Sequence, residues 1–326
     1  MLNPFRLSAL TLTLLAALAA ATSAQAQGWP DRTVRIVVPY APGGGVSVLA
    51  QILGTKLSEI VKQPVVIDNR PGAGGNIGSD AVAKAAPDGY TLLLHTSALA
   101  SAPALYKTLP FDVMKDFAPV TMVIATQFIV AGTHKNPATT LRELVAQAKA
   151  NPGKLNYASS GPGSSLHLFA ELFKSAAGVD FQHIPYRGDA PMITALIAGD
   201  VHLAFLPQAT GGAAVQGNTV RGLAVTGTKR QAALPHLPTV REEGVAGLEE
   251  GSWNAMWAPA GTPPGIVKAI QENMAKVLAD PTVRERLTSV GQEPVGNSSA
   301  EFAGQFKADV ERFARVVETA KIPKLD

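Results

Sequence analysis

The segment VRIVVPYAPGGGVSVLAQILGTKLSEI, residues 34–60, decides the fold. Residues 34–38 are apolar and mostly β-branched, apart from Arg35, and this pattern predicts a buried strand. Two prolines and three glycines follow within residues 39–45; the prolines end the strand and the glycines permit a tight turn. Apolar residues then recur every three or four positions up to Ile60, which predicts an amphipathic helix.

The start of this helix is a candidate anion site. The first N–H groups of a helix have no intrahelical partner, and the helix dipole places partial positive charge there. Such an end binds anions without a cationic side chain. The spacing fits neither a dinucleotide motif, because Val48 stands where the last glycine would be, nor a P-loop, because no Gly-Lys-Ser/Thr follows. A tight turn without a ligand explains the same residues, so both interpretations stay open at this point.

Composition limits the class of protein. The 326 residues with 46% hydrophobic content suffice for two domains with ordinary cores. The net charge is +3 and the Lys and Arg residues are scattered, so we expect no nucleic-acid partner. The six histidines include no H-E-x-x-H motif and no close pair, so we expect no metal site, and we assign no cofactor.

The N-terminus has the features of a secretory signal peptide. Arg6 precedes an apolar run over residues 7–21, which is short for a membrane span. The small residues Ala24 and Ala26 predict cleavage after Ala26, so that residues 1–26 are the signal peptide; an uncleaved anchor helix is the alternative. The chain has no cysteine, so we expect neither a lipoprotein anchor nor a disulfide. We expect an exported protein, located in the periplasm if the cell is Gram-negative.

Strands and helices alternate along the rest of the chain, which predicts an α/β protein with mostly parallel sheets. The apolar stretch at residues 117–130 is too long for one ordinary strand, and we interpret it as a connection between two domains. The extended residues 253–260 are expected to return to the first domain. We therefore predict domain 1 from residues 27–124 plus 251–326, and domain 2 from residues 125–250.

The second domain repeats the design of the opening segment. A strand at residues 155–158 runs into the loop SSGPGSS, residues 159–165, and a predicted helix follows. The serine hydroxyls can donate to a carboxylate or cap the helix, and the sequence does not separate these two roles. Two such helix starts that face each other across a cleft would form a hinged binding protein that closes over a small anion.

We expect the ligand at the carboxyl ends of the strands, where open α/β sheets hold their ligands. The candidate ligand-binding residues are Tyr40, Gly43, Gly44, Ser47, Thr96, Ser97, Ser159, Ser160, Gly161, Ser164, Ser165, Tyr186 and Arg187. The guanidinium fork of Arg187 suits a second carboxylate, with a rim position or a salt bridge to Asp189 as the alternative. We assign no catalytic residue, because the serine loop contains no G-x-S-x-G elbow.

Sequence blocks along nearly the whole mature length resemble one family. Among these blocks are VVPYAPGG at 37–44, NRPGAGGNIG at 69–78, AAPDGYTLL at 85–93, YASSG at 157–161 and APAGTP at 258–263. On these blocks the chain resembles the Bug-type extracytoplasmic receptors of tripartite tricarboxylate transporters. The resemblance implies a type II periplasmic-binding-protein fold, with two α/β domains joined by a hinge around a ligand cleft. It also implies a receptor that captures a small carboxylate near the first glycine loop and delivers it to a membrane permease.

Two departures from the family pattern concern the ligand. The family's first loop usually continues Gly-Gly-x-Thr-Asp, whereas Ser47 stands at the aspartate position here. Many members carry Asp-Asn after the strand at residues 201–205, whereas this chain has Leu206 and Pro207. A carboxylate at either place would pair with a ligand ammonium group. We therefore expect a dicarboxylate, a hydroxy acid or an aromatic acid rather than an amino acid.

Other functions are compatible with the same residues. A periplasmic sensor module of this fold would pass its closed state to a histidine kinase, and neighbouring genes would separate it from a transport receptor. A secreted hydrolase that uses the serine loop is the third hypothesis, and assays for ester and amide turnover would test it. Our prediction is a transport receptor that is monomeric and not an enzyme.

Overall fold

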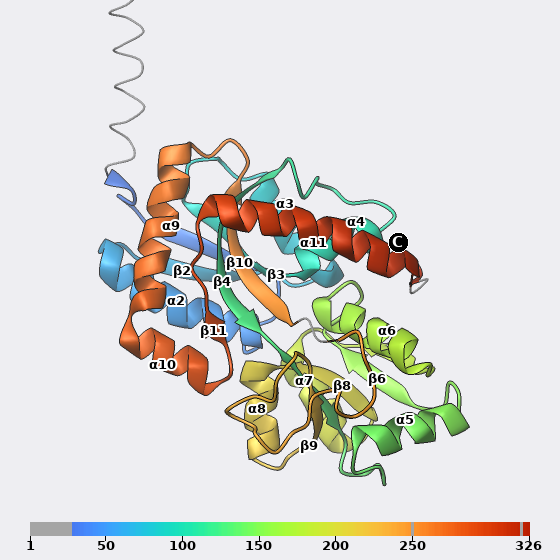
Figure 1. The fold of residues 1–326 in the computed structure, drawn as a ribbon. Coiled ribbons are helices and arrows are strands. Elements are labelled where there is room, and N and C mark those ends of the chain that lie inside the picture. The colour runs from blue at the N-terminus through green and yellow to red at the C-terminus, as the bar shows by residue number, and fades with distance from the viewer. Residues whose placement is uncertain (1–27, 249–250, 320–321) are drawn as a thin grey trace, which may run out of the picture.

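The computed structural model describes residues 28–248, 251–319 and 322–326. The predicted signal peptide, residues 1–26, lies outside the described residues. Two β-sheets with their helices form the upper and lower parts of the molecule in Figure 1. The two-domain α/β organisation expected from the alternation of strands and helices is therefore confirmed.

The upper part contains a six-stranded sheet. Its strands, in spatial order, are β11 (Glu293–Pro294), β4 (Phe117–Thr126), β10 (Ser252–Pro259), β3 (Thr91–Thr96), β1 (Val34–Val38) and β2 (Val65–Asn69). Its helical elements are α2 (Gly45–Val61), η2 (Ala73–Gly75), α3 (Asn76–Ala83), α4 (Ala98–Leu105), α9 (Pro264–Ala279), α10 (Pro281–Ser289) and α11 (Ser299–Thr319). The opening segment has the predicted order of β1, a glycine turn and α2.

The lower part contains a five-stranded sheet. Its strands, in spatial order, are β7 (Gln182–Pro185), β6 (Asn156–Ser159), β8 (Leu203–Pro207), β5 (Phe128–Gly132) and β9 (Arg221–Val225). Its helices are α5 (Leu141–Ala150), α6 (Ser165–Ala177), α7 (Asp189–Ala198) and α8 (Gln208–Gln216). Hereafter the two parts are called the six-stranded domain and the five-stranded domain.

The prediction of mostly parallel sheets is wrong, because both sheets are mixed. β1 pairs in parallel with β2 and β3, and β6 pairs in parallel with β7 and β8, as helical crossovers require. β10 is antiparallel to both β3 and β4, and β5 is antiparallel to both β8 and β9. The reason is the route of the chain: β10 and β5 are the strands by which the chain enters each sheet from the other domain. They therefore run opposite to the neighbours that they join.

The stretch at residues 117–130 crosses between the domains as expected. β4 belongs to the six-stranded sheet, β5 belongs to the five-stranded sheet, and Gln127 alone separates them. Figure 1 shows β4 running down toward the lower sheet. The return crossing leads into β10. We therefore expect the ligand-binding region between the two sheets, beside the two segments in which the chain crosses from one domain to the other.

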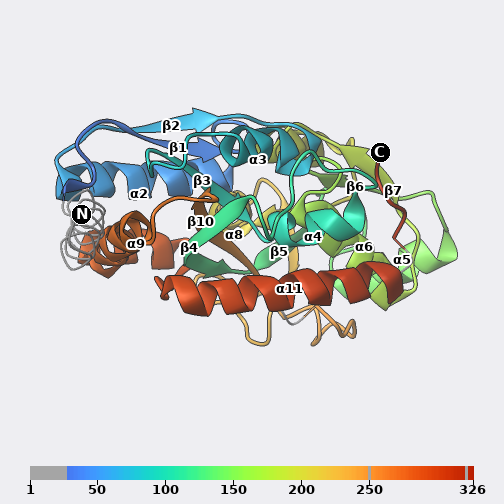
Figure 2. The same cartoon turned by 90° about the horizontal axis from the view of Figure 1, so that it is seen from above.

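Alternating side chains fix the two faces of the six-stranded sheet. Ile36 and Leu92 point into a core with α2 and α9, whereas Val37 and Leu93 point into a core with α4 and α11. The second core is aromatic: the rings of Trp257 and Phe302, for example, lie 5.2 Å apart between centroids. Figure 2 shows the result, with α2 and α11 on opposite sides of the molecule.

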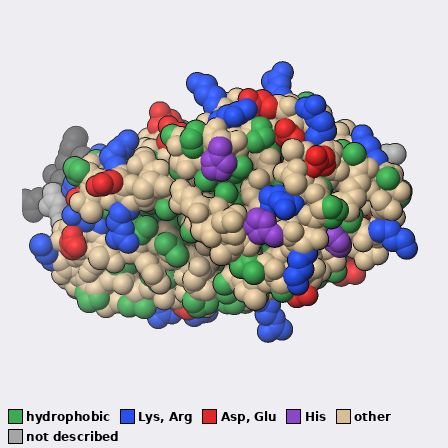
Figure 3. Space-filling view, turned by 90° about the horizontal axis from the view of Figure 1, so that it is seen from below, with side chains coloured by type: hydrophobic (Ala, Val, Ile, Leu, Met, Phe, Trp, Pro, Cys, Tyr) green, Lys and Arg blue, Asp and Glu red, His purple; other side chains and the backbone are tan. Residues whose placement is uncertain are grey.

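The helices and the surface bear on two other classes, membrane-spanning and nucleic-acid-binding proteins. Within the described ranges, we find no helix with the length and apolar character needed to cross a bilayer. On the face drawn in Figure 3, Lys and Arg side chains are interspersed with Asp and Glu. This face therefore has no continuous basic surface.

Candidate ligand-binding cleft

The start of α2 lies in the cleft between the domains. Gly44 is the N-cap residue, with an extended backbone and no side chain to cap the helix. The N–H of Gly45 instead donates to Oδ2 of Asp189, at 2.8 Å. Asp189 opens α7 in the five-stranded domain, so this hydrogen bond crosses the cleft. The anion expected at this helix start is thus present as a side chain of the protein itself.

Asp189 was not among the predicted site residues. Its side chain is buried, at 8% exposure, and burial raises the pKa of its carboxyl while the Gly45 hydrogen bond partly offsets that effect. No ion pair to Asp189 is found among the described residues, so a salt bridge from Arg187 is not formed. The expected preference against amino acids was drawn from the loss of the family's carboxylates at Ser47, Leu206 and Pro207. Asp189 places a carboxylate in the cleft from a different element, α7.

Two neighbouring cavities, which share four lining residues, lie along the cleft. The inner cavity, of about 30 Å³, is lined by Gly44, Gly45, Asp189 and Pro207 together with polar groups of Ser252 and Asn254. The outer cavity, of about 530 Å³, is lined by the loop 71–75, by Ser160 to Pro162, and by Pro185 to Gly188. Tyr40, Ala41, Ser160 and Gly188 line both cavities. The outer cavity has the size of a small-molecule site.

A second hydrogen bond joins the domains at the outer cavity. The hydroxyl of Tyr106, at the end of α4, donates to the carbonyl oxygen of Pro162 at 2.8 Å. The glycine loops pack closely here, since a Cβ on Gly74 would lie 2.6 Å from that same oxygen, and both Gly74 and Gly163 have positive φ angles. Only glycine fits such positions without strain. The two loops therefore close one wall of the outer cavity.

Tyr40 is held at the border of both cavities by a buried polar network. Its hydroxyl lies 2.9 Å from Oγ1 of Thr96 and 3.4 Å from Nδ1 of His95. Burial raises the pKa of the Tyr40 phenol above its usual range and lowers the pKa of His95 to about 3. Both groups are therefore neutral at physiological pH, and they contribute hydrogen-bonding capacity rather than charge to the cleft.

The serines of the loop at residues 159–165 have two roles: one caps α6, and others line the cavities. Oγ of Ser164 accepts from the N–H of His167 at 3.2 Å and donates to the carbonyl of Gly161 at 2.7 Å, so Ser164 caps α6. Ser160 and Ser165 line the cavities. The capping role that the sequence left open thus applies to Ser164, whereas Ser160 and Ser165 are the serines that line the cavities.

Ser159 is hydrogen-bonded to a histidine, but its hydroxyl is not accessible to a substrate. Its Oγ lies 2.6 Å from Nε2 of His183, a separation that resembles a nucleophile and its base. The side chain of Ser159 is fully buried, and its oxygen also bonds the backbone of Gly161. His183 stacks between Tyr157 and His167. A substrate cannot reach this hydroxyl in the structure, so the pair supports packing rather than hydrolysis.

The structure brings eight of the thirteen predicted residues to the cavities. Those that line them are Tyr40, Gly44, Thr96, Ser160, Gly161, Ser165, Tyr186 and Arg187. Those that line neither cavity are Gly43, Ser47, Ser97, Ser159 and Ser164. Gly43 is exposed in the turn; the others are buried, and Ser97, for example, bonds Ser252 at 2.8 Å instead of facing the cleft. Arg187 is exposed and holds the rim position named as its alternative.

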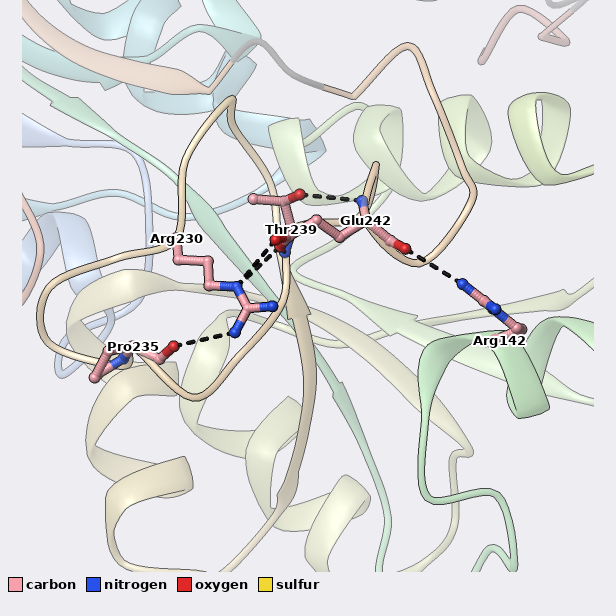
Figure 4. A network of polar contacts seen from close by, with 5 residues as sticks. All are labelled: Arg142, Arg230, Pro235, Thr239 and Glu242. Carbon is pink, nitrogen blue, oxygen red and sulfur yellow. Dashed lines mark hydrogen bonds and ion pairs between the residues drawn. The ribbon is translucent and has the colours of Figure 1, made fainter.

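A third cavity, of about 800 Å³, lies beside the chain crossings and includes several arginines. Arg230 is already engaged there: its Nε lies 3.0 Å from Oε2 of Glu242, as Figure 4 shows. The same glutamate is anchored to Thr239, and its carbonyl accepts from Arg142. Arg312 pairs with Asp309 at 2.8 Å. Arg230 and Arg312 are thus paired with acidic partners, and Lys229 and Arg315 line the same cavity.

Fold and site together define a class: a periplasmic-binding-protein fold, in which two α/β domains enclose a ligand between them. Residues 49–322 match the model of the tripartite tricarboxylate transporter family receptor. The chain therefore belongs to this family, which is one of solute-binding receptors and not of enzymes. The members are periplasmic binding proteins.

Solved structures of similar proteins agree with this assignment. The periplasmic binding protein BugD is 33% identical, with a TM-score of 0.87 over 91% of this chain and 100% of that chain. Rpa4515 of R. palustris, solved with adipate, is 37% identical, with a TM-score of 0.88 over 91% and 100%. MatC from Rhodopseudomonas palustris, solved with bound malate, is 30% identical, with a TM-score of 0.85 over 89% and 100%.

Proposed function

We propose that this protein is the periplasmic receptor of a tripartite tricarboxylate-type transporter, which captures a small carboxylate and delivers it to membrane permease subunits. The observation that carries the proposal is the outer cavity, enclosed by glycine loops of both domains with hydroxyls inside and Arg187 at its rim. Backbone amides, hydroxyls and a guanidinium are the groups that bind carboxylates. The adipate and malate bound by the two R. palustris proteins are acids of suitable size.

The ligand classes we propose are a dicarboxylate, a hydroxy acid or an aromatic acid. The contacts we propose come from the eight cavity-lining residues already named, with the carboxylate at the outer cavity. The expected preference against amino acids depended on the loss of carboxylates at Ser47 and at Leu206 and Pro207, and Asp189 supplies a carboxylate in the cleft. Amino acids therefore belong in the test as competitors.

Thermal-shift screening of the mature protein against mono-, di- and tricarboxylates tests the proposal, followed by calorimetry. A ligand present at 100 times its Kd adds about 2.7 kcal/mol to the free energy of unfolding, so a true ligand raises Tm clearly. We expect at least one carboxylate to do so, while neutral sugars and amines do not. A stabilising neutral sugar, with no effect from any acid, would overturn the proposal.

Transport and cellular location need separate measurements. We propose cleavage after Ala26, a monomeric mature protein, and domains formed by residues 27–124 plus 251–326 and by residues 125–250. Mass spectrometry of the periplasmic fraction should find Gln27 at the N-terminus, and light scattering should give the monomer mass. Deleting the gene should abolish uptake of the acid found by screening. Normal uptake, with loss of a transcriptional response instead, would indicate the sensor function.

A further inference from the structure

The two ends of the cleft differ in charge. Arg187 stands at the outer cavity, whereas the inner cavity has the Asp189 carboxylate and no basic side chain among its lining residues. Tyr40, which interacts with Asp189 and lines the same cavity, is neutral for the reason given above. The hydrogen bond from Gly45 and the dipole of α2 favour the ionised form of Asp189, against the burial that raises its pKa. With Asp189 ionised, a ligand that spans both cavities meets a cation at one end and an anion at the other.

Asp189 already uses the amide that a ligand carboxylate would need. The N–H of Gly45 donates to its Oδ2, and this is the hydrogen bond that the structure gives to the carboxylate. An ionised carboxylate has about four acceptor positions, so one bond leaves most of them available. In the described part of the chain, no Asp189 oxygen is among the fully buried polar atoms that lack a partner, so Oδ1 stays accessible from the inner cavity, where a ligand group can donate to it.

A second carboxylate in the inner cavity would have the opposite effect. Two like charges in contact within a low-dielectric site repel strongly, and no described basic side chain in that cavity compensates. The cavity is also small, at about 30 Å³, which leaves room for a compact group such as a hydroxyl. Gly44 lines the same cavity, and a Cβ there would lie 3.1 Å from Oδ2 of Asp189, so glycine at this position keeps the space beside Asp189 open.

We propose that Asp189 is a specificity-determining residue of the carboxylate site. It excludes a ligand carboxylate from the start of α2 and selects an acid whose inner end donates a hydrogen bond. The ligand class is thereby narrowed to a monocarboxylate with a hydroxyl, or an ammonium group, at the end remote from the carboxylate. This inference rests on the proposed function, because it assumes that an acid is bound in the cleft.

A matched series of acids measures how the group at the inner end of the ligand affects affinity. Adipate, 6-hydroxyhexanoate and 6-aminohexanoate share six carbons and one carboxylate, and differ only in the remote group. Succinate, 4-hydroxybutyrate and 4-aminobutyrate repeat the comparison at four carbons. Calorimetry gives the Kd of each acid for the wild type, Asp189→Asn, Asp189→Ser and the control Asp180→Asn. Asp180 is an exposed carboxylate of the same domain, so the control removes equal charge outside the cleft.

The readout is the ratio of Kd values within one chain length. We expect the wild type to bind the hydroxy acid at least tenfold more tightly than the dicarboxylate. Both Asp189 variants should reduce this ratio tenfold or more, mainly by tightening dicarboxylate binding, while Asp180→Asn preserves it. Asp189→Ser gives the answer if Asp189→Asn does not fold, since serine suits a helix start.

Failure of the inference and failure of the proposed function look different. If acids bind but the ratio is the same in wild type and Asp189 variants, or the wild type prefers the dicarboxylate, Asp189 does not determine specificity and the receptor function stands. If none of the acids binds any form of the protein, the carboxylate receptor and the inference are both wrong.

Discussion

The starts of α2 and α6 have similar sequences, but different groups accept hydrogen bonds from their first backbone amides. Each follows a strand and a loop of glycine and small residues, and each opens toward the cleft. α6 is capped by its own N-cap residue, Ser164, whose Oγ accepts from the N–H of His167 three residues further along the chain. α2 has no side-chain cap, and its first amide is satisfied by Asp189 from the other domain. A helix start without its own cap is thus the one available for interactions across the cleft.

The largest effect should follow from a second carboxylate at the start of α2. In Gly44→Asp the new side chain would begin 3.1 Å from Oδ2 of Asp189, and like charges in contact cost several kcal/mol. We expect affinity for the tightest acid of the panel to fall by roughly 100-fold or more. Calorimetry measures this loss.

Two control variants define the cause of that loss. Gly44→Ala adds the Cβ without the charge and should bind nearly as the wild type does. Gly44→Asp combined with Asp189→Asn should recover part of the affinity. Equal losses in Gly44→Ala and Gly44→Asp would show that shape, not charge, matters at this helix start.

Acid should weaken the native state through two buried histidines, His95 and His167. Burial lowers the pKa of His95 to about 3 and that of His167 to about 4, below the ordinary value near 6.5. The unfolded chain therefore binds these protons first, so stability is full above about pH 6.5 and is lost as pH falls toward 4. The loss is at most about 1.4 kcal/mol per pH unit for each histidine.

Urea unfolding at pH 7.5, 5.5 and 4.5 measures this dependence. His167→Gln removes one titrating group at the start of α6 and should flatten the pH dependence between pH 6 and 4.5. A variant with the wild-type slope would show that His167 is protonated equally in both states.

Loss of the α6 cap should have a moderate effect on stability. Ser164→Ala removes the acceptor for the His167 N–H, and the free energy of unfolding should fall by about 1 kcal/mol. Ser165→Ala is the matched control, because Ser165 lines the inner cavity and does not cap the helix. Affinity should change more in Ser165→Ala than in Ser164→Ala. The reverse order would mean that Ser164 binds the ligand directly.

The smallest effect should come from the second interdomain hydrogen bond. Tyr106→Phe removes the hydroxyl that donates to Pro162, and a neutral hydrogen bond contributes about 1 kcal/mol. Ligand affinity should weaken by a few-fold, because closure loses one contact at the outer cavity. Tyr90→Phe, which loses a hydroxyl bonded to Asp31 away from the cleft, is the control. A similar loss in both variants would contradict a role for Tyr106 in closure.

Whether a feature could be predicted from the sequence depends on how far apart its interacting residues lie along the chain. The strand, glycine turn and α2 were predictable because their apolar spacing and turn residues are local, and the capping option for Ser164 was visible for the same reason. Asp189 was overlooked because its partner, Gly45, is 144 residues away in sequence. Ser97 and Ser159 were misplaced because a polar residue at a strand end can face inward, and only tertiary packing decides this.

The mixed sheets have a similar explanation. Each βαβ crossover was recognisable, but β5 and β10 take their direction from the other domain. That direction depends on how the chain crosses between the domains, which no local periodicity encodes. The family blocks indicated the two-domain fold without these details.

A crystal structure of the protein with the tightest acid of the panel tests the central claim most directly. We predict that the acid lies unchanged between the two sheets, with a carboxylate at the outer cavity near Ser160, Gly161 and Arg187, and a donor group within hydrogen-bonding distance of Asp189. An acid bound in the cavity beside Arg230, or one that has been chemically converted, would contradict the account.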